Sequence, residues 1–162
     1  MCSLYGCLSY GKPLSNSDLT ELVKQLGIAA MVRGVDATGI AYAHKNRLHT
    51  IKAARPADEF VFELPERIMA VMGHTRLTTQ GSEMNNYNNH PFFGYAGADV
   101  FVLAHNGMID NDAQLRQEFG LAMSKIQTDS YVAVQLLEKQ GRLDINVIKL
   151  RVSRRRGKKR ME

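Results

Sequence analysis

Two short apolar runs, each followed directly by a polar cluster, constrain the fold of this chain most. Residues 68–72 (IMAVM) run into the polar stretch 73–81, and residues 100–104 (VFVLA) run into 105–107 (HNG). Apolar runs of about five residues are typical of buried strands. The sequence therefore predicts two buried strands, each ending in a cluster of groups suited to a small polar ligand.

Helical and strand patterns alternate along the rest of the chain. Apolar residues at helical spacing predict a helix over 18–31, preceded by N-cap candidates at 15–18. The other expected elements are a strand over 4–10, a hairpin of strands 39–43 and 47–52, and helices over 110–119 and 129–139, the last with Thr128 as N-cap. Strands mixed with helices and a hairpin predict an α+β or layered α/β fold.

Length and charge narrow the class of protein. The 162 residues suffice for one domain with a sizeable core. No apolar run reaches the roughly 18 residues of a membrane helix, and no secretory signal pattern is present, so neither a spanning nor a secreted protein is expected. Residues 151–162 hold seven Lys or Arg residues and one Glu, so the remaining chain is close to neutral despite the net charge of +5. A body-wide nucleic-acid surface is therefore not expected, although the tail itself could bind nucleic acid or anionic lipid.

Both cysteines lie at the N-terminus, which excludes a disulfide framework and predicts a cytoplasmic chain with reduced thiols. Cys2 directly follows the initiator Met, which is normally removed before a small residue. The thiol and a free α-amine would then share one residue. Because that amine has a pKa of about 7.7–8.0, it could act as the base for its own thiol. The alternative is a buried and inert cysteine.

The polar clusters add groups that would suit such a thiol. Arg76 could bind a carboxylate bidentately, and the Asn106 amide with the Gly107 N–H could form an oxyanion hole. Asp129, at an expected helix start, could pair with an ammonium group. Together with Cys2 they indicate acyl transfer from an α-amino acid that bears a side-chain amide. Each could instead be a capping, loop or salt-bridge residue, and Asn-Gly is also a turn signature.

Five segments of the chain carry motifs in a fixed order. They are 1–6 (MCSLYG), 33–41 (RGVDATGIA), 73–81 with 89–91 (GHTRLTTQG and NHP), 104–107 (AHNG) and 128–130 (TDS). In this order they resemble the class II glutamine amidotransferases, which are N-terminal-nucleophile amidohydrolases and whose corresponding motifs include RGxDS/TGIA, GHTRWATHG and NAHP. The resemblance spans about residues 1–140. Within this family, GHTR with NNHP is closer to the hexosamine-forming enzymes than to the purine-forming ones.

This resemblance implies a catalytic centre that hydrolyses glutamine to glutamate and ammonia. Cys2 would be the nucleophile that forms a glutamyl thioester, with its own α-amine as the base. Asn106 and Gly107 would stabilise the oxyanion of the tetrahedral intermediate. The implied fold is a four-layer αββα sandwich, in which a central strand presents the nucleophile at its N-terminus.

The resemblance also implies a substrate pocket. Arg76 would bind the α-carboxylate of glutamine and Asp129 its α-amino group, while Thr79 and Gln80 would line the pocket, largely through their backbone. No metal and no organic cofactor is expected. The five histidines show neither HxxxH nor HExxH spacing, and no CxxC is present.

The chain also departs from the family pattern. Ser3 stands where the family has Gly, Leu77 where it has an aromatic residue, and Gln80 where it has His. We expect residues 1–144 to form an amidotransferase domain that is incomplete at its C-terminus, followed by a divergent basic tail over 145–162.

The partners follow from these expectations. The expected partners are glutamine and a possible separate synthase subunit that accepts the ammonia. Binding to a membrane or to nucleic acid is not expected. Two alternatives stay open. One is a stand-alone N-terminal-cysteine amidohydrolase that acts on another amide. The other is an inactive truncated fragment with a nucleic-acid-binding basic tail.

Overall fold

A computed structural model describes residues 2–144, and the expected basic tail over 145–162 lies outside the described residues. The larger of the two sheets has four strands in the order β1-β4-β2-β3, and all neighbouring strands are antiparallel. The strands are β1 (Ser3–Leu8), β2 (Ala37–His44), β3 (Arg47–Ala53) and β4 (Ala70–Arg76). The pairing of Ser3 with Thr75 brings the start of the chain to the end of β4.

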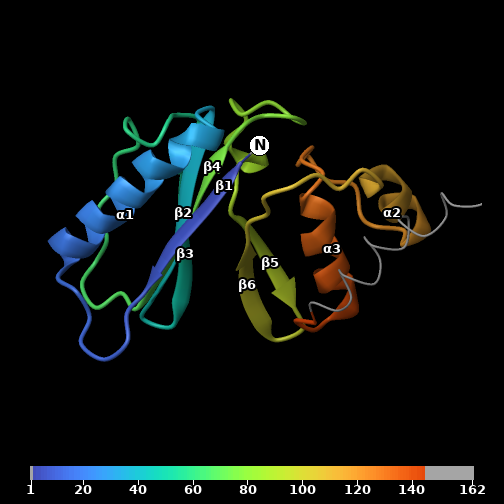
Figure 1. Ribbon diagram of the computed structural model, residues 1–162. Helices are drawn as coiled ribbons and strands as arrows, with labels where there is room; N and C mark the ends of the chain where they lie inside the picture. Colours follow the sequence, from blue (N-terminus) through green and yellow to red (C-terminus); the bar gives the residue numbers. More distant parts are fainter. Residues whose placement is uncertain (1, 145–162) are drawn as a thin grey trace, which may run out of the picture.

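Helix α1 (Asn16–Ala30) covers one face of this sheet (Figure 1). The helix begins where the Ser15 hydroxyl accepts the backbone N–H of Asp18 at 3.1 Å, an N-cap. Its apolar stripe packs against inward-facing strand residues and an irregular segment that precedes β4. The buried members of this core are Leu19, Val23, Ile40, Phe60, Phe62, Leu64, Ile68 and Val71.

A hairpin of two strands follows on the other side of the four-stranded sheet, with helices beyond it (Figure 1). These elements are β5 (Phe92–Ala96), β6 (Asp99–Leu103), α2 (Asp112–Glu118) and α3 (Tyr131–Gln140), with short 3-10 turns at Met31–Arg33 and Asn86–Asn88. Phe92 and Phe101 pack against Val134 and Leu137 of α3. Leu115 of α2 packs on the adjoining side of α3.

Figure 1 shows α1, the four-stranded sheet, the β5–β6 hairpin and the helix pair following one another across the molecule. The expectation of an α+β fold is confirmed to the extent that the chain is a mixed α/β domain. The β5–β6 hairpin covers only part of the four-stranded sheet. A cavity of about 530 Å³ is left between them, lined by Ala41 and Met72 of the sheet and by Val102 of the hairpin. Leu8, at its rim, is 65% exposed. No helix within residues 2–144 has both the length and the hydropathy that a membrane span needs.

The strand at the N-terminus, the first helix and the hairpin are confirmed, with ends shifted by up to two residues. Lys45 and Asn46 form the hairpin turn with φ values of 49° and 58°, as a two-residue turn between twisted strands requires. The predicted strand over 100–104 corresponds to β6. The helix expected over 110–119 is shorter, and the one expected over 129–139 begins two residues later.

Three sequence expectations are corrected. The strand expected over 68–72 begins at Ala70 and continues through Arg76, because its polar residues pair in register with β1 and β2. Strand β5, which the sequence patterns did not predict, directly follows Pro91. Thr128 is not the N-cap of α3, since that position belongs to Ser130 and the Thr128 hydroxyl donates to the carbonyl of Asn88 at 2.7 Å.

Candidate active site

The candidate site lies where β1 begins and β4 ends. Cys2 immediately precedes the Ser3–Thr75 pair, so its side chain reaches the residues that follow β4. The thiol is half-buried and donates to the carbonyl oxygen of Leu77 at 3.6 Å. Register therefore brings the N-terminal cysteine next to Arg76, although 74 positions separate the two residues in the sequence.

Arg76 is 2% exposed and is held by three hydrogen bonds. Its Nη1 donates to Oδ1 of Asn89 at 2.6 Å, and its Nη2 donates to the carbonyls of Gln80 and Gly81 at 2.6 and 2.8 Å. Burial lowers the pKa of Arg76, while the charges of Cys2, Glu83, Asp36 and Asp129 raise it, but a guanidinium stays charged at neutral pH. These three contacts use three of its five N–H donors, so one donor on Nε and one on Nη1 have no partner among the described residues.

Asp129 lines a small cavity, and neither Arg76 nor Cys2 is among its lining residues. Its Oδ2 accepts the backbone N–H of Ile109 at 2.6 Å, and its Oδ1 accepts the Ser130 hydroxyl at 3.3 Å. The cavity measures about 230 Å³, which suits a small polar ligand. Its lining residues are Thr79, Gln80, Met108, Ile109, Asp110, Asp112 and Asp129. Three of the predicted substrate-binding residues thus share one cavity.

Asn106 and Gly107 lie on the loop that leads from β6 into this cavity. Both are exposed, and within residues 2–144 the Asn106 side-chain amide has no hydrogen-bond partner. The ring of His105 packs so closely that a Cβ at Gly107 would lie 2.8 Å from its Nε2. His105 in turn is fixed by Ser130, whose hydroxyl lies 3.0 Å from Nδ1. The loop therefore offers an unused amide on a backbone held by its neighbours.

Two asparagines that sequence reasoning left without a role connect the loops of the site. The side chain of Asn88 donates to the carbonyl of Ser82 at 3.0 Å and accepts the backbone N–H of Gln127 at 2.9 Å. Asn89 contacts Arg76, as described above. Both asparagines are buried; Asn88 ties the loop after β4 to the segment that carries Asp129, and Asn89 ties the same loop to Arg76. The sequence signals for them were an Asn-rich stretch without periodicity and, for Asn89, the NHP segment that matches the family motif.

Asp36 is a further residue that the motifs contain but that received no role. Its Oδ2 accepts the backbone N–H of Thr78 at 2.6 Å, and its own N–H donates to the carbonyl of Arg76 at 3.0 Å. The preceding Gly34 leaves no room for a side chain, because a Cβ there would lie 2.5 Å from the Arg76 carbonyl carbon. The segment 33–36 thus fixes the backbone that carries Arg76.

Buried histidines lie behind the site, between the two sheets. The rings of His74 and His90 are 4.2 Å apart, and Phe92 lies 4.4 Å beyond His90. Burial lowers the pKa of His74 to about 4 and holds that of His90 well below its usual value, so both rings are neutral at pH 7. Within the described residues, no group of three or more His, Cys, Asp or Glu is arranged to hold a metal ion.

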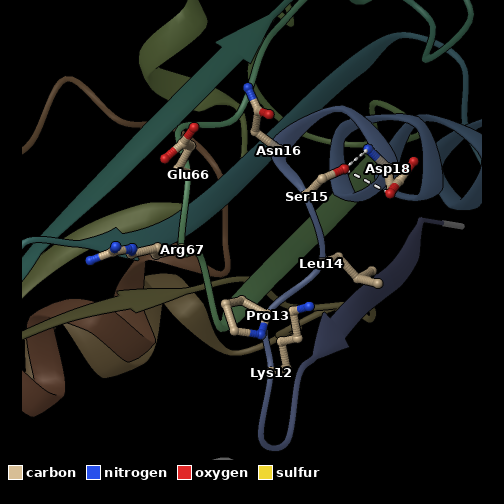
Figure 2. A pocket seen from close by; sticks show the side chains of 8 residues that line it. All are labelled: Lys12, Pro13, Leu14, Ser15, Asn16, Asp18, Glu66 and Arg67. Carbon is tan, nitrogen blue, oxygen red and sulfur yellow. Dashed lines mark hydrogen bonds between the residues drawn. The ribbon is translucent and has the colours of Figure 1, made fainter.

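A separate cavity of about 550 Å³ lies beside the start of α1, away from these groups (Figure 2). Its charged side chains are Lys12, Asp18, Glu66 and Arg67. Ser15 already engages Asp18, donating to its Oδ2 at 2.7 Å, and Figure 2 shows Glu66 and Arg67 extending in different directions. Since these groups do not converge on one point, this cavity is not the candidate active site.

Comparison with known proteins gives one family. The family model described as glutamine amidotransferases class-II matches residues 1–139. The glutamine–fructose-6-phosphate aminotransferase (isomerizing) of Bacillus subtilis is 39% identical over 109 residues, which cover 65% of this chain and 18% of that protein. The enzymes of the same name from Streptococcus pyogenes serotype M3 and Chlamydia trachomatis are 30% and 32% identical, over 86% of this chain and 22% of theirs. The chain thus spans about a fifth of the length of these curated relatives.

Proposed function

The chain belongs to the class II glutamine amidotransferase family, and from this membership we propose that it hydrolyses the side-chain amide of glutamine to glutamate and ammonia at Cys2. The observation that carries the proposal is the location of the Cys2 thiol beside Leu77 and Arg76, where β1 and β4 meet. A nucleophile at the second position of the sequence fits an enzyme that uses its own terminal amine as base.

The proposed reaction has two stages. After removal of Met1, the α-amine of Cys2 takes the thiol proton, and the sulfur attacks the side-chain amide carbon of glutamine. The new C–S bond gives a tetrahedral oxyanion. This intermediate collapses with cleavage of the C–N bond, and the nitrogen leaves as ammonia after it receives the proton from the amine. Water then hydrolyses the thioester, which releases glutamate and returns the thiol.

Asn106 and Gly107 are proposed to stabilise the oxyanion. The unused side-chain amide of Asn106 supports this role, because its N–H groups are not committed to other acceptors among the described residues. The close packing of His105 on Gly107 supports a fixed backbone N–H. Donors that are already oriented need no rearrangement when the negative charge develops, so they favour the transition state over the ground state.

Arg76 and Asp129 are proposed to bind the α-carboxylate and the α-ammonium group of glutamine. Arg76 keeps two N–H donors beyond its three contacts with the protein, which supports its binding of the α-carboxylate. The second role is supported by the cavity that Asp129 shares with Thr79 and Gln80, which are proposed to line the substrate. A fixed cation and a fixed anion would together select α-amino acids.

The finer architecture and the partners belong to the same proposal. The order of layers in Figure 1 supports a four-layer αββα sandwich. Residues 1–144 are proposed as the amidotransferase domain and 145–162 as a basic tail, in a cytoplasmic protein. The names of the relatives state an amino transfer to fructose 6-phosphate. We accordingly propose that the ammonia passes to an acceptor-binding synthase unit, on a separate subunit.

Incubation with diazo-oxo-norleucine, a glutamine-like electrophile, tests the proposal. Intact mass should show loss of Met1 and the addition of one inhibitor fragment, with peptide mapping to Cys2. The variant Cys2→Ala should lose both labelling and ammonia release from glutamine. The matched variant Cys7→Ala, on the α1-facing side of β1, should keep both. Ammonia release that persists in Cys2→Ala would refute the proposal.

A further inference from the structure

We infer that Asn89 is a positioning residue that sets the guanidinium of Arg76 for the α-carboxylate of the substrate, an inference that rests on the function proposed above. The side chain is 1% exposed, and its Oδ1 accepts Nη1 of Arg76 at 2.6 Å. A hydrogen bond to a charged donor is among the stronger ones in proteins. Asn89 therefore acts on Arg76 and not on the ligand.

The orientation of the Asn89 amide is fixed by its other end. Its Nδ2 donates to the carbonyl of Glu83 at 2.8 Å and to Oδ1 of Asn86 at 3.2 Å. With both N–H groups directed to these acceptors, the amide oxygen can only face Arg76. The contact is thus built into the loop and does not depend on a ligand.

The backbone of Asn89 is held independently of its side chain. Lys52 of β3 donates from Nζ to the Asn89 carbonyl at 2.8 Å, and Asn86 donates to the Lys52 carbonyl at 2.7 Å. These contacts pin the loop to the sheet even if the Asn89 side chain is shortened. Removal of the amide therefore frees Nη1 of Arg76, while Nη2 keeps its two carbonyl acceptors and the loop keeps its anchor.

The contact distinguishes this chain from the family pattern. When His90-Pro91 is aligned with the end of NAHP, Asn88 takes the place of the asparagine and Asn89 that of the alanine. A second departure nearby, Thr78 in place of the alanine of GHTRWATHG, has a buried hydroxyl without a partner among the described residues. Of these two positions, only residue 89 contacts the guanidinium of Arg76.

The physical consequence is preorganisation. An arginine side chain loses much rotamer freedom when a ligand orders it, and this loss weakens binding. With Nη1 on Asn89 and Nη2 on the carbonyls of Gln80 and Gly81, the guanidinium plane is set before the ligand arrives. The two remaining donors then have a fixed direction. Asn89 should consequently affect ligands that carry the α-carboxylate and spare those that lack it.

The test compares two ligands by NMR titration of the full chain. L-Glutamate carries the α-carboxylate, and 4-aminobutanoate is the same molecule without it. In Asn89→Ala the dissociation constant of L-glutamate should rise about tenfold, the range expected for a lost charged hydrogen bond, while that of 4-aminobutanoate stays unchanged. The matched control is Asn85→Ala, an exposed asparagine on the same loop, whose side chain makes no hydrogen bond within residues 2–144.

A second variant covers the case in which Asn89→Ala does not fold. Asn89→Asp keeps the shape and the acceptor for Nη1, but its charge pairs with Arg76, so it should also weaken L-glutamate selectively. Equal binding of L-glutamate by wild type and by a folded Asn89 variant would overturn the inference and leave the proposed function standing. If wild type binds no L-glutamate and releases no ammonia from glutamine, the proposed function fails, and this inference fails with it.

Discussion

Asp36 and Thr78 lie 42 positions apart in the sequence, yet the Asp36 carboxylate accepts the Thr78 backbone N–H at 2.6 Å. The N–H of Asp36 donates to the carbonyl of Arg76, two residues earlier, at 3.0 Å. One residue thus holds both ends of the turn that leaves β4. The turn carries Arg76 on one side and leads to Thr79 and Gln80 on the other, so the shape of the proposed pocket depends on a side chain outside it.

Replacement of Asp36 by alanine should therefore loosen this turn. A hydrogen bond to a charged acceptor contributes about 1.5–3 kcal/mol, so we expect the free energy of unfolding to fall by about that amount. Urea denaturation followed by circular dichroism measures this change. The exposed Asp58→Ala serves as control and should unfold like wild type. An Asp36→Ala variant as stable as that control would show that the turn does not need the carboxylate.

Asn106→Ala should lower kcat for glutamine hydrolysis while leaving KM nearly unchanged. Loss of one oxyanion donor typically reduces kcat by about 10²–10³-fold, because the donor acts on charge that exists only in the transition state. Steady-state ammonia release measures both constants. The control is Asn111→Ala. Asn111 lies on the same loop, at the N-cap of α2, and its side chain makes no capping hydrogen bond, so this variant should retain wild-type kcat. A KM effect in Asn106→Ala without loss of kcat would contradict an oxyanion role.

Asp129→Asn should instead raise KM for glutamine while changing kcat little. The amide can still accept the backbone N–H of Ile109, so the local structure keeps its contact. The negative charge that would bind the substrate ammonium is lost, and we expect KM for glutamine to rise at least about tenfold, equivalent to about 1.4 kcal/mol. Initial rates over a range of glutamine concentrations give the result. An unchanged KM would remove Asp129 from the proposed binding site.

Much of the fold could be read from the sequence because local and global signals agree there. Leu19 and Val23 at helical spacing, and Lys45-Asn46 between two alternating strands, specify α1 and the β2–β3 hairpin directly. Strand β4 extends through His74 and Arg76, which are polar and look like loop. Only pairing with β1 and β2 makes these residues strand, and pairing between residues 29 to 72 positions apart leaves no local trace in the sequence.

The sequence indicated which residue types form the proposed site, but not which residues hold them in place. The cysteine, the arginine and the HNG loop each carry a recognisable chemistry in their side chains. The roles of Asp36 and Asn89 arise from contacts to Thr78 and Arg76, which the folded chain alone creates. Thr128 was predicted as an N-cap from its residue type. Its hydroxyl instead donates to the carbonyl of Asn88, a tertiary contact that overrides the local preference.

Acid should destabilise the chain through the buried histidines. His90 faces only basic groups among those that shift its pKa, namely His74, Arg76, His105 and Lys52, and none of its ring nitrogens has a partner within residues 2–144. An unfolded histidine titrates near pH 6.5, whereas the pKa of His74 in the folded chain is about 4. Protons therefore bind preferentially to the unfolded state. The stability that the neutral rings provide is complete above about pH 6.5 and is lost as pH falls toward 4.

Between pH 7 and pH 5 this linkage amounts to about 2 kcal/mol for His74. Urea midpoints measured at both pH values give the loss for wild type, which also contains contributions from carboxylates. In His74→Gln the loss should shrink by about the share of one histidine, because that site no longer titrates. His44→Gln, at the tip of the β2–β3 hairpin, is the matched control and should show the wild-type loss. If His74→Gln and His44→Gln lose equal stability on acidification, the buried rings do not govern the acid response.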